Sequence, residues 1–213
     1  MHVLDTRATR ATLASRGRFL TLVTLSYNSL EGLIALTAGV MAGSIALVGF
    51  GADSIIEVMA AGAVLWRLAA DADLTRRVRA ERLSLRIVGA CFLALAAYIT
   101  VDALLTLRLR RAPERSTVGI VLAVTSLIVM PVLARAKRRV AVGLASRALT
   151  AEAQQTQLCA YLSAILVVGL LLNATIGWWW ADPVAALAMA PIIAREGVAA
   201  LRGEAICADG CCG

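Results

Sequence analysis

Six long apolar stretches, separated by clusters of arginine, constrain this chain more than any other feature of its sequence. A helix of about 20 apolar residues is long enough to cross a hydrocarbon core about 30 Å thick. Hydrophobic residues make up 60% of the chain, well above the apolar share of soluble domains. We therefore predict an all-α, polytopic membrane protein whose six transmembrane helices cover residues 19–39, 44–66, 83–106, 117–134, 145–176 and 180–201.

The positive charges lie mainly on one predicted side of the membrane. They gather in residues 1–18 and in the predicted loops 67–86 and 135–147, whereas residues 108–115 carry only four arginines. Because cytoplasmic loops accumulate Lys and Arg, both termini are predicted to be cytoplasmic and the protein to lie in the cell (inner or plasma) membrane. The net charge of +7 then reflects topology and contact with anionic lipid, so we expect no nucleic-acid partner.

The predicted helices divide the chain into three parts. Residues 1–18 form a cytoplasmic arm, residues 19–202 the transmembrane domain, and residues 203–213 a cytoplasmic tail. The arginines of the arm resemble the start of a signal peptide, but Asn28 and Glu31 interrupt the apolar stretch and no clear cleavage site follows. The first helix is therefore predicted to be retained.

The tail contains Cys207, Cys211 and Cys212. In a reducing cytoplasm these thiols can capture a soft metal ion, or they can belong to a frayed end without a function. They do not form the C-x-x-C pattern of thiol oxidoreductases, and the chain shows no nucleophile beside a base and no phosphate-binding glycine loop. We predict that the protein is not an enzyme.

Two acidic residues, Asp53 and Glu57, lie inside the second apolar stretch and project from one face of a helix. An ionised carboxylate near the bilayer centre costs about 2.5–3.5 kcal/mol on the insertion scale. The pair must therefore be protonated, paired with a cation or facing water. None of the 21 Lys and Arg residues lies in the middle of a predicted span, so the positive charge can come from a proton or from a bound metal ion. The alternative is that both acids stay protonated and bond to neighbouring helices. Asn28 and Glu31 either extend an ion path toward Asp53 or pair structurally.

The fifth apolar stretch repeats the pattern of the second. A Ser-x-Ala-Leu sequence begins nine residues before Asp53 and again nine residues before Gln155, and Cys159 follows Gln155 as Glu57 follows Asp53. The two helices enter the bilayer from opposite faces, so both pairs reach its midplane, as in an inverted repeat. A chance match between two Ala- and Leu-rich helices is the alternative reading.

Together these side chains offer two carboxylates, an amide oxygen and a thiol. Four donors suffice for a tetrahedral Zn²⁺ site, and a sulfur ligand disfavours Mg²⁺ and Ca²⁺. We predict that Asp53, Glu57, Gln155 and Cys159 bind the metal, and that proton loss from the ligands couples binding to proton exchange. Gln155 can instead serve as an interhelical hydrogen bonder and Cys159 as a small apolar residue.

The sequence resembles the cation diffusion facilitator (cation efflux) family. The resemblance rests on residues 43–47 leading to Asp53 and Glu57, on 146–149 leading to Gln155 and Cys159, and on 177–183, and it covers essentially all six stretches. In that family the second and fifth helices each supply an acid-or-His pair that forms a tetrahedral site for Zn²⁺ or a similar ion. The resemblance also implies proton-coupled efflux, generally by a homodimer.

Two departures from the family pattern stand out. The fifth-helix pair is commonly His and Asp, but Gln155 cannot ionise and Cys159 is a thiol. A short tail stands where the family usually has a cytoplasmic metal-binding domain, which resembles a compact, divergent branch that includes zinc-binding vesicle-membrane relatives. We predict a transporter of divalent transition-metal cations, Zn²⁺ first, working by alternating access. The alternative is a non-transporting membrane protein that binds metal as a sensor.

Overall fold

The computed structural model describes residues 2–69, 74–144 and 147–202, and within these ranges the chain forms six α-helices and no strand. The predicted all-α class is confirmed for this part of the chain. The helices are α1 (His2–Ala42), α2 (Ile45–Ala69), α3 (Leu74–Leu109), α4 (Thr117–Leu144), α5 (Arg147–Thr175) and α6 (Ala181–Arg202).

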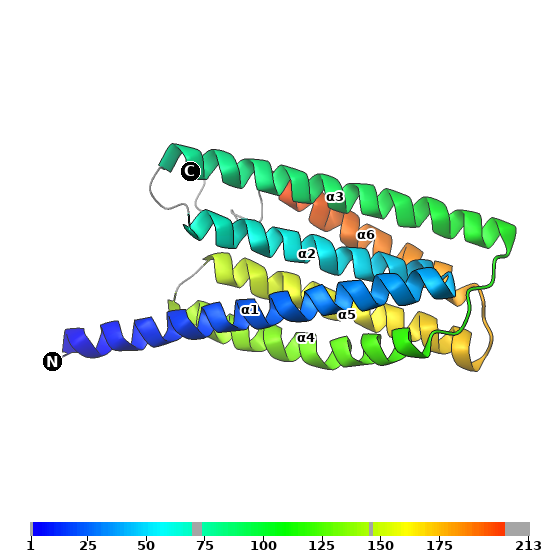
Figure 1. The fold of residues 1–213 in the computed structure, drawn as a ribbon, viewed down its shortest axis with the longest axis horizontal. Helices are drawn as coiled ribbons and strands as arrows, with labels where there is room; N and C mark the ends of the chain where they lie inside the picture. The colour runs from blue at the N-terminus through cyan, green and yellow to red at the C-terminus, as the bar shows by residue number, and fades with distance from the viewer. Residues whose placement is uncertain (1, 70–73, 145–146, 203–213) are drawn as a thin grey trace.

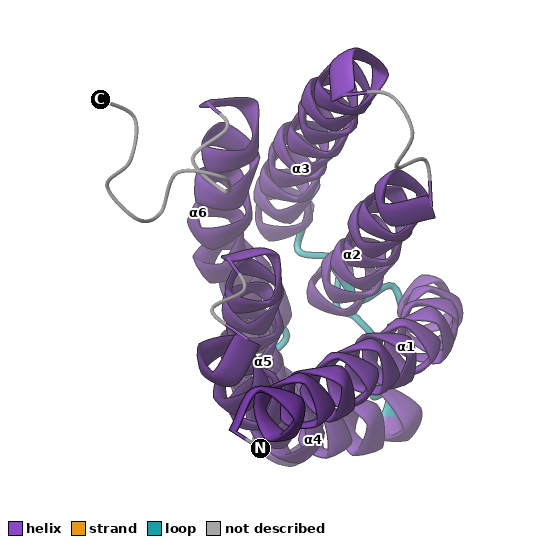
Figure 2. Ribbon diagram, turned by 90° about the vertical axis from the view of Figure 1, so that its left-hand side faces the viewer, coloured by secondary structure: helices purple, strands orange, loops and turns teal. Residues whose placement is uncertain are grey.

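Consecutive helices run in opposite directions, so α6 runs back toward the end of the bundle at which α1 begins (Figure 1). Viewed from that end, the helices follow one another around the bundle in the order α1, α2, α3, α6, α5, α4 (Figure 2). Helix α2 also contacts α5 and α6 across the centre. Helices α2 and α5 are antiparallel, which agrees with the direction predicted from the inverted repeat.

Five helices contain segments long and apolar enough to cross a membrane, counted over the described residues. These segments are Ser15–Ala42, Arg86–Leu109, Thr117–Gly143, Glu152–Thr175 and Ala181–Arg202. Large apolar side chains such as Leu33, Val121 and Ile128 are exposed on the outside of the bundle, where lipid replaces water as the solvent. The sequence predicts six spans, and the sixth, which corresponds to α2, stays a prediction.

The helices are longer than the apolar stretches that predict them. Helix α1 begins at His2, α3 at Leu74, and α4 continues to Leu144. Much of the predicted arm and of the predicted loops is therefore helical. Polar ends continue a helix because Arg, Ala, Glu and Leu all have high helix propensity, whereas hydropathy marks only the lipid-facing part.

The turn between α1 and α2 is short because a glycine closes it. Gly43 has a φ of 62°, a left-handed conformation that glycine adopts without steric cost. The Gly43 amide donates to the Val40 carbonyl and the Ser44 amide to the Gly39 carbonyl, the two bonds of a Schellman motif. The two helices consequently form a tight antiparallel pair.

Candidate metal centre

Asp53 and Glu57 lie one turn apart on α2 and are only 4% and 7% exposed. Both line a small cavity inside the bundle, and Gln155 reaches the same cavity from α5. The structure thus brings together three of the four predicted ligands. The remaining lining comes from α3, α5 and α6, through Phe92, Leu158, Leu162, Ile192, Ile193 and Glu196.

The cavity has a volume of about 10 Å³, close to the space that one water molecule needs. Most of its walls are apolar side chains. A hydrated divalent ion does not fit such a space, whereas an ion that has exchanged its waters for protein oxygens does. The site therefore favours direct coordination by side chains.

The two carboxylates differ in their surroundings. Among the described residues, none donates a hydrogen bond to Asp53 or forms an ion pair with it, although it is buried. Glu57 accepts a hydrogen bond of 2.7 Å from Nδ2 of Asn28 on α1. Asn28 thus forms an interhelical hydrogen bond with the acidic pair, as the structural one of its two predicted roles requires.

Cys159 faces a different group of side chains. It is fully buried, and its Sγ lies 3.8 Å from Oε2 of Glu31. Glu31 also accepts hydrogen bonds from Ser54, at 2.9 Å, and from Ser126, and the Ser126 hydroxyl lies 2.8 Å from that of Tyr27. This second polar cluster joins α1, α2, α4 and α5, and Cys159 does not line the cavity that holds Gln155.

Lys137 requires a correction. The sequence places it in the loop 135–147, outside the membrane, but the structure continues α4 past it and buries it completely. Its Nζ lies 2.8 Å from Oε1 of Glu152 and 3.2 Å from the Thr156 hydroxyl. The Thr21 hydroxyl donates to the other oxygen of Glu152. A partly buried ion pair therefore joins α4 and α5, and the Thr21 hydrogen bond attaches α1 to it.

Glu196 is the cavity-lining acid that the sequence did not predict. It stands on α6, half-buried, beside the exposed Arg195. An acid next to an arginine near the end of an apolar stretch has the appearance of a membrane-boundary residue. The packing of α6 against α2 and α5 places it on the inward side of the helix.

The predicted ligands do not form a closed coordination shell in this conformation. Within the described ranges, no three His, Cys, Asp or Glu side chains lie close enough together to hold a metal ion. The tail cysteines Cys207, Cys211 and Cys212 lie outside the described residues.

Comparison with known families agrees with this geometry. The pattern that defines the cation efflux transmembrane domain matches residues 21–204. The chain belongs to the cation efflux family. Membership makes it a multi-pass membrane protein and supports metal-cation transport. No curated protein matched the chain.

Proposed function

We propose that this cation efflux protein exports a divalent transition-metal cation, Zn²⁺ first, in exchange for protons. The observation that carries the proposal is the meeting of Asp53, Glu57 and Gln155 from α2 and α5 at one ion-sized cavity. These are the positions at which the sequence resembles the ligand pairs of the family.

Asp53, Glu57 and Gln155 are the proposed ligands, with Cys159 as a fourth donor once its thiol turns from Glu31 to the cavity. Gln155 and Cys159 lie one turn apart on α5, so a modest rotation of that helix brings the thiol nearer. A thiolate beside carboxylate oxygens suits Zn²⁺ better than Mg²⁺.

Proton exchange follows from the burial of the acids. When the metal leaves, two carboxylates remain in an apolar environment, and such groups regain protons because an unpaired buried charge is unfavourable. The return of the empty site then carries protons in the opposite direction to the metal.

Alternating access is supported by how the helices group. Helices α3 and α6 pack extensively against each other, while α4 pairs with α5 and α1 with α2. The cavity is lined both by the α3–α6 pair and by α2 and α5. A movement of the α3–α6 pair relative to the other four helices opens the cavity without unfolding either group. A homodimer is proposed from the family resemblance.

Metal transport is tested with the full chain in proteoliposomes that contain a zinc-sensitive dye and a pH gradient. Wild type is expected to move Zn²⁺ and protons in opposite directions, and Asp53→Ala and Glu57→Ala to abolish both fluxes. Glu114→Ala is the matched control, because Glu114 is an exposed acid in the connection between α3 and α4. Transport by both site variants at the wild-type rate would overturn the proposal. Saturable zinc binding by wild type without any flux would instead support the sensor function.

A further inference from the structure

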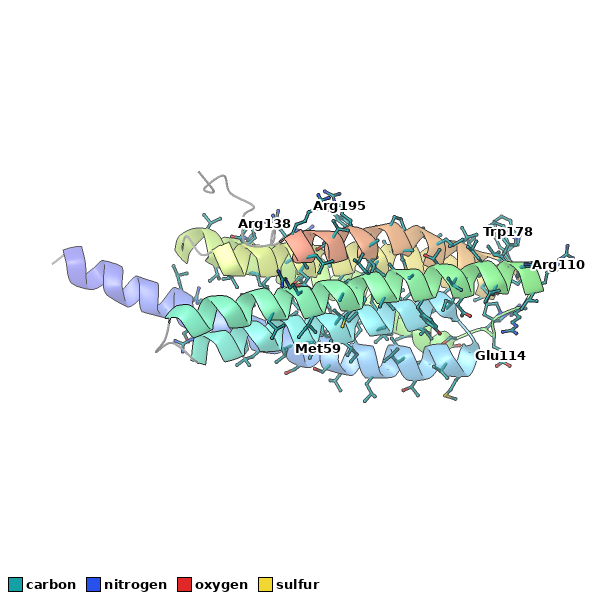
Figure 3. All side chains as sticks on the ribbon, turned by 90° about the horizontal axis from the view of Figure 1, so that it is seen from above. Met59, Arg110, Glu114, Arg138, Trp178 and Arg195 are labelled. Atoms are coloured by element: carbon teal, nitrogen blue, oxygen red, sulfur yellow. The ribbon has the colours of Figure 1, made fainter. Side chains whose placement is uncertain are left out.

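Glu196 brings a third carboxylate to the cavity, from a helix that contributes none of the ligands proposed above. It lines the cavity together with Asp53 and Glu57. Its neighbour Arg195 points away from the bundle, on the outside of α6 (Figure 3). Because the two residues are adjacent on the helix, the Arg195 guanidinium lies on the outside of α6 and the Glu196 carboxylate faces the cavity.

Carboxylates outnumber basic side chains at the cavity. Its described lining includes three acids and no Lys or Arg, and Gln155 is neutral. Neither Asp53 nor Glu196 accepts a hydrogen bond from any described residue. Glu196 also interacts electrostatically with both α2 acids. Lys137 offsets part of the negative charge at Glu57, and Arg195 offsets part of it at Glu196. Such an arrangement is unfavourable when the cavity is empty and favourable when a divalent cation enters it.

We propose that Glu196 attracts the divalent cation into the cavity from the α6 wall and raises the affinity of the site for it. This inference rests on the proposed transport function. It assigns to α6 the negative charge that Gln155 does not supply on α5. It also gives the α3–α6 pair a direct electrostatic interaction with the bound cation, so cation binding favours closure of that pair on the cavity.

In the described conformation Glu196 acts through its field and not as a third ligand, since no three acids converge to metal-binding distance. Loss of its charge should therefore weaken capture of the cation and leave the later steps intact. Groups outside the immediate ligand set commonly change metal affinity by roughly ten- to a hundredfold.

The test measures Zn²⁺ binding by calorimetry, and the concentration dependence of Zn²⁺ transport, for the full chain carrying Glu196→Gln or Glu196→Asp. We expect Glu196→Gln to weaken binding at least about tenfold and to raise KM with little change in the maximal rate. Glu196→Asp retains the charge and is expected to stay close to wild type. Glu114→Gln makes the same chemical change on an exposed acid and should have no effect.

Each outcome decides the question. Wild-type affinity in Glu196→Gln, with binding lost in Asp53→Ala, would overturn the role of Glu196 and leave the transport function standing. Equal weakening by Glu196→Asp and Glu196→Gln would exclude charge as the cause and would also overturn it. Wild-type transport by Asp53→Ala and Glu57→Ala would refute the transport function itself. Should Glu196→Gln fail to fold, as judged by helicity and monodispersity, Glu196→Ala takes its place, with the same weakening expected and wild-type affinity overturning the role.

Discussion

Asp182, in the first turn of α6, accepts hydrogen bonds from the side chain of Ser44 and from the backbone amide of Ile45, at 2.9 Å, at the beginning of α2. Ser44 in turn accepts a hydrogen bond of 3.1 Å from the Leu47 amide, as an N-cap residue does. A carboxylate of one helix thus completes the cap of another and favourably faces the positive end of its dipole. The two helices that carry Asp53 and Glu196 are joined at this end of the bundle.

Substitution of Asp182 should destabilise the bundle. Asp182→Ala leaves buried donors of α2 without partners, which should lower the free energy of unfolding by about 2–4 kcal/mol. Asp182→Asn keeps an acceptor oxygen and should cost less. Thermal unfolding in detergent, followed by circular dichroism, measures the difference. An unchanged midpoint for Asp182→Ala would show that water replaces the cap.

The Lys137–Glu152 ion pair should be strongly coupled. Lys137→Met leaves Glu152, whose side chain is 23% exposed, without its cation, and should cost about 1–3 kcal/mol, less than the loss of one partner from a fully buried pair. Lys137→Met combined with Glu152→Leu removes both charges and should recover most of that loss. A double-mutant cycle on unfolding midpoints tests this, and additive effects of the two single substitutions would contradict it.

Two glycines of α2 should respond oppositely to alanine. A Cβ at Gly51 would lie 2.7 Å from the Leu36 backbone nitrogen, whereas one at Gly62 meets nothing within 4 Å. We expect Gly51→Ala to separate α1 from α2 and cost about 1–3 kcal/mol, and Gly62→Ala to stabilise α2 by up to about 1 kcal/mol through helix propensity. The same unfolding assay compares them. Tolerance of alanine at Gly51 would mean that the helices approach less closely than described.

Cys159 should influence which metal is preferred. If its thiol joins the bound ion, Cys159→Ser lowers the affinity for Zn²⁺ and Cd²⁺ more than for Mn²⁺, because a hydroxyl is a harder donor. Competition titrations of the purified full chain with these three ions measure the order. An equal change for all three would place Cys159 with Glu31 in every state and would leave an oxygen-only site.

Spacing in the sequence alone indicates that Asp53, Glu57 and Gln155 lie together, and the structure places all three at one cavity, while their role as ligands stays a prediction. The four-residue interval between Asp53 and Glu57 places both on one face of the helix, and their position within the apolar stretch indicates how deep in the membrane they lie. Gln155 was reached through the repeated pattern. The orientation of Cys159 depends on the rotation of α5 relative to α1 and could not follow from spacing.

Lys137 and Glu196 were missed because they stand among other charges near helix ends. Helical periodicity nevertheless indicates that Lys137 faces inward, since it lies on the same helix face as the buried residues Met130, Ala134 and Ala141. In the same way Met189, Ile193 and Ala200 mark the inward face on which Glu196 stands. Hydropathy averages over both faces of a helix and therefore hides a single inward charge.

The side-chain amide of Asn28 can either donate a hydrogen bond to Glu57 or accept one from it. Its Nδ2 donates to the Glu57 carboxylate, while its buried Oδ1 has no hydrogen-bond partner in the described part of the chain. After a flip of the amide, the same side chain accepts the hydrogen of a neutral carboxylic acid. Asn28 can therefore stabilise Glu57 in either ionisation state with no displacement of α1 against α2. An aspartate or a lysine at this position would favour one state and oppose the other.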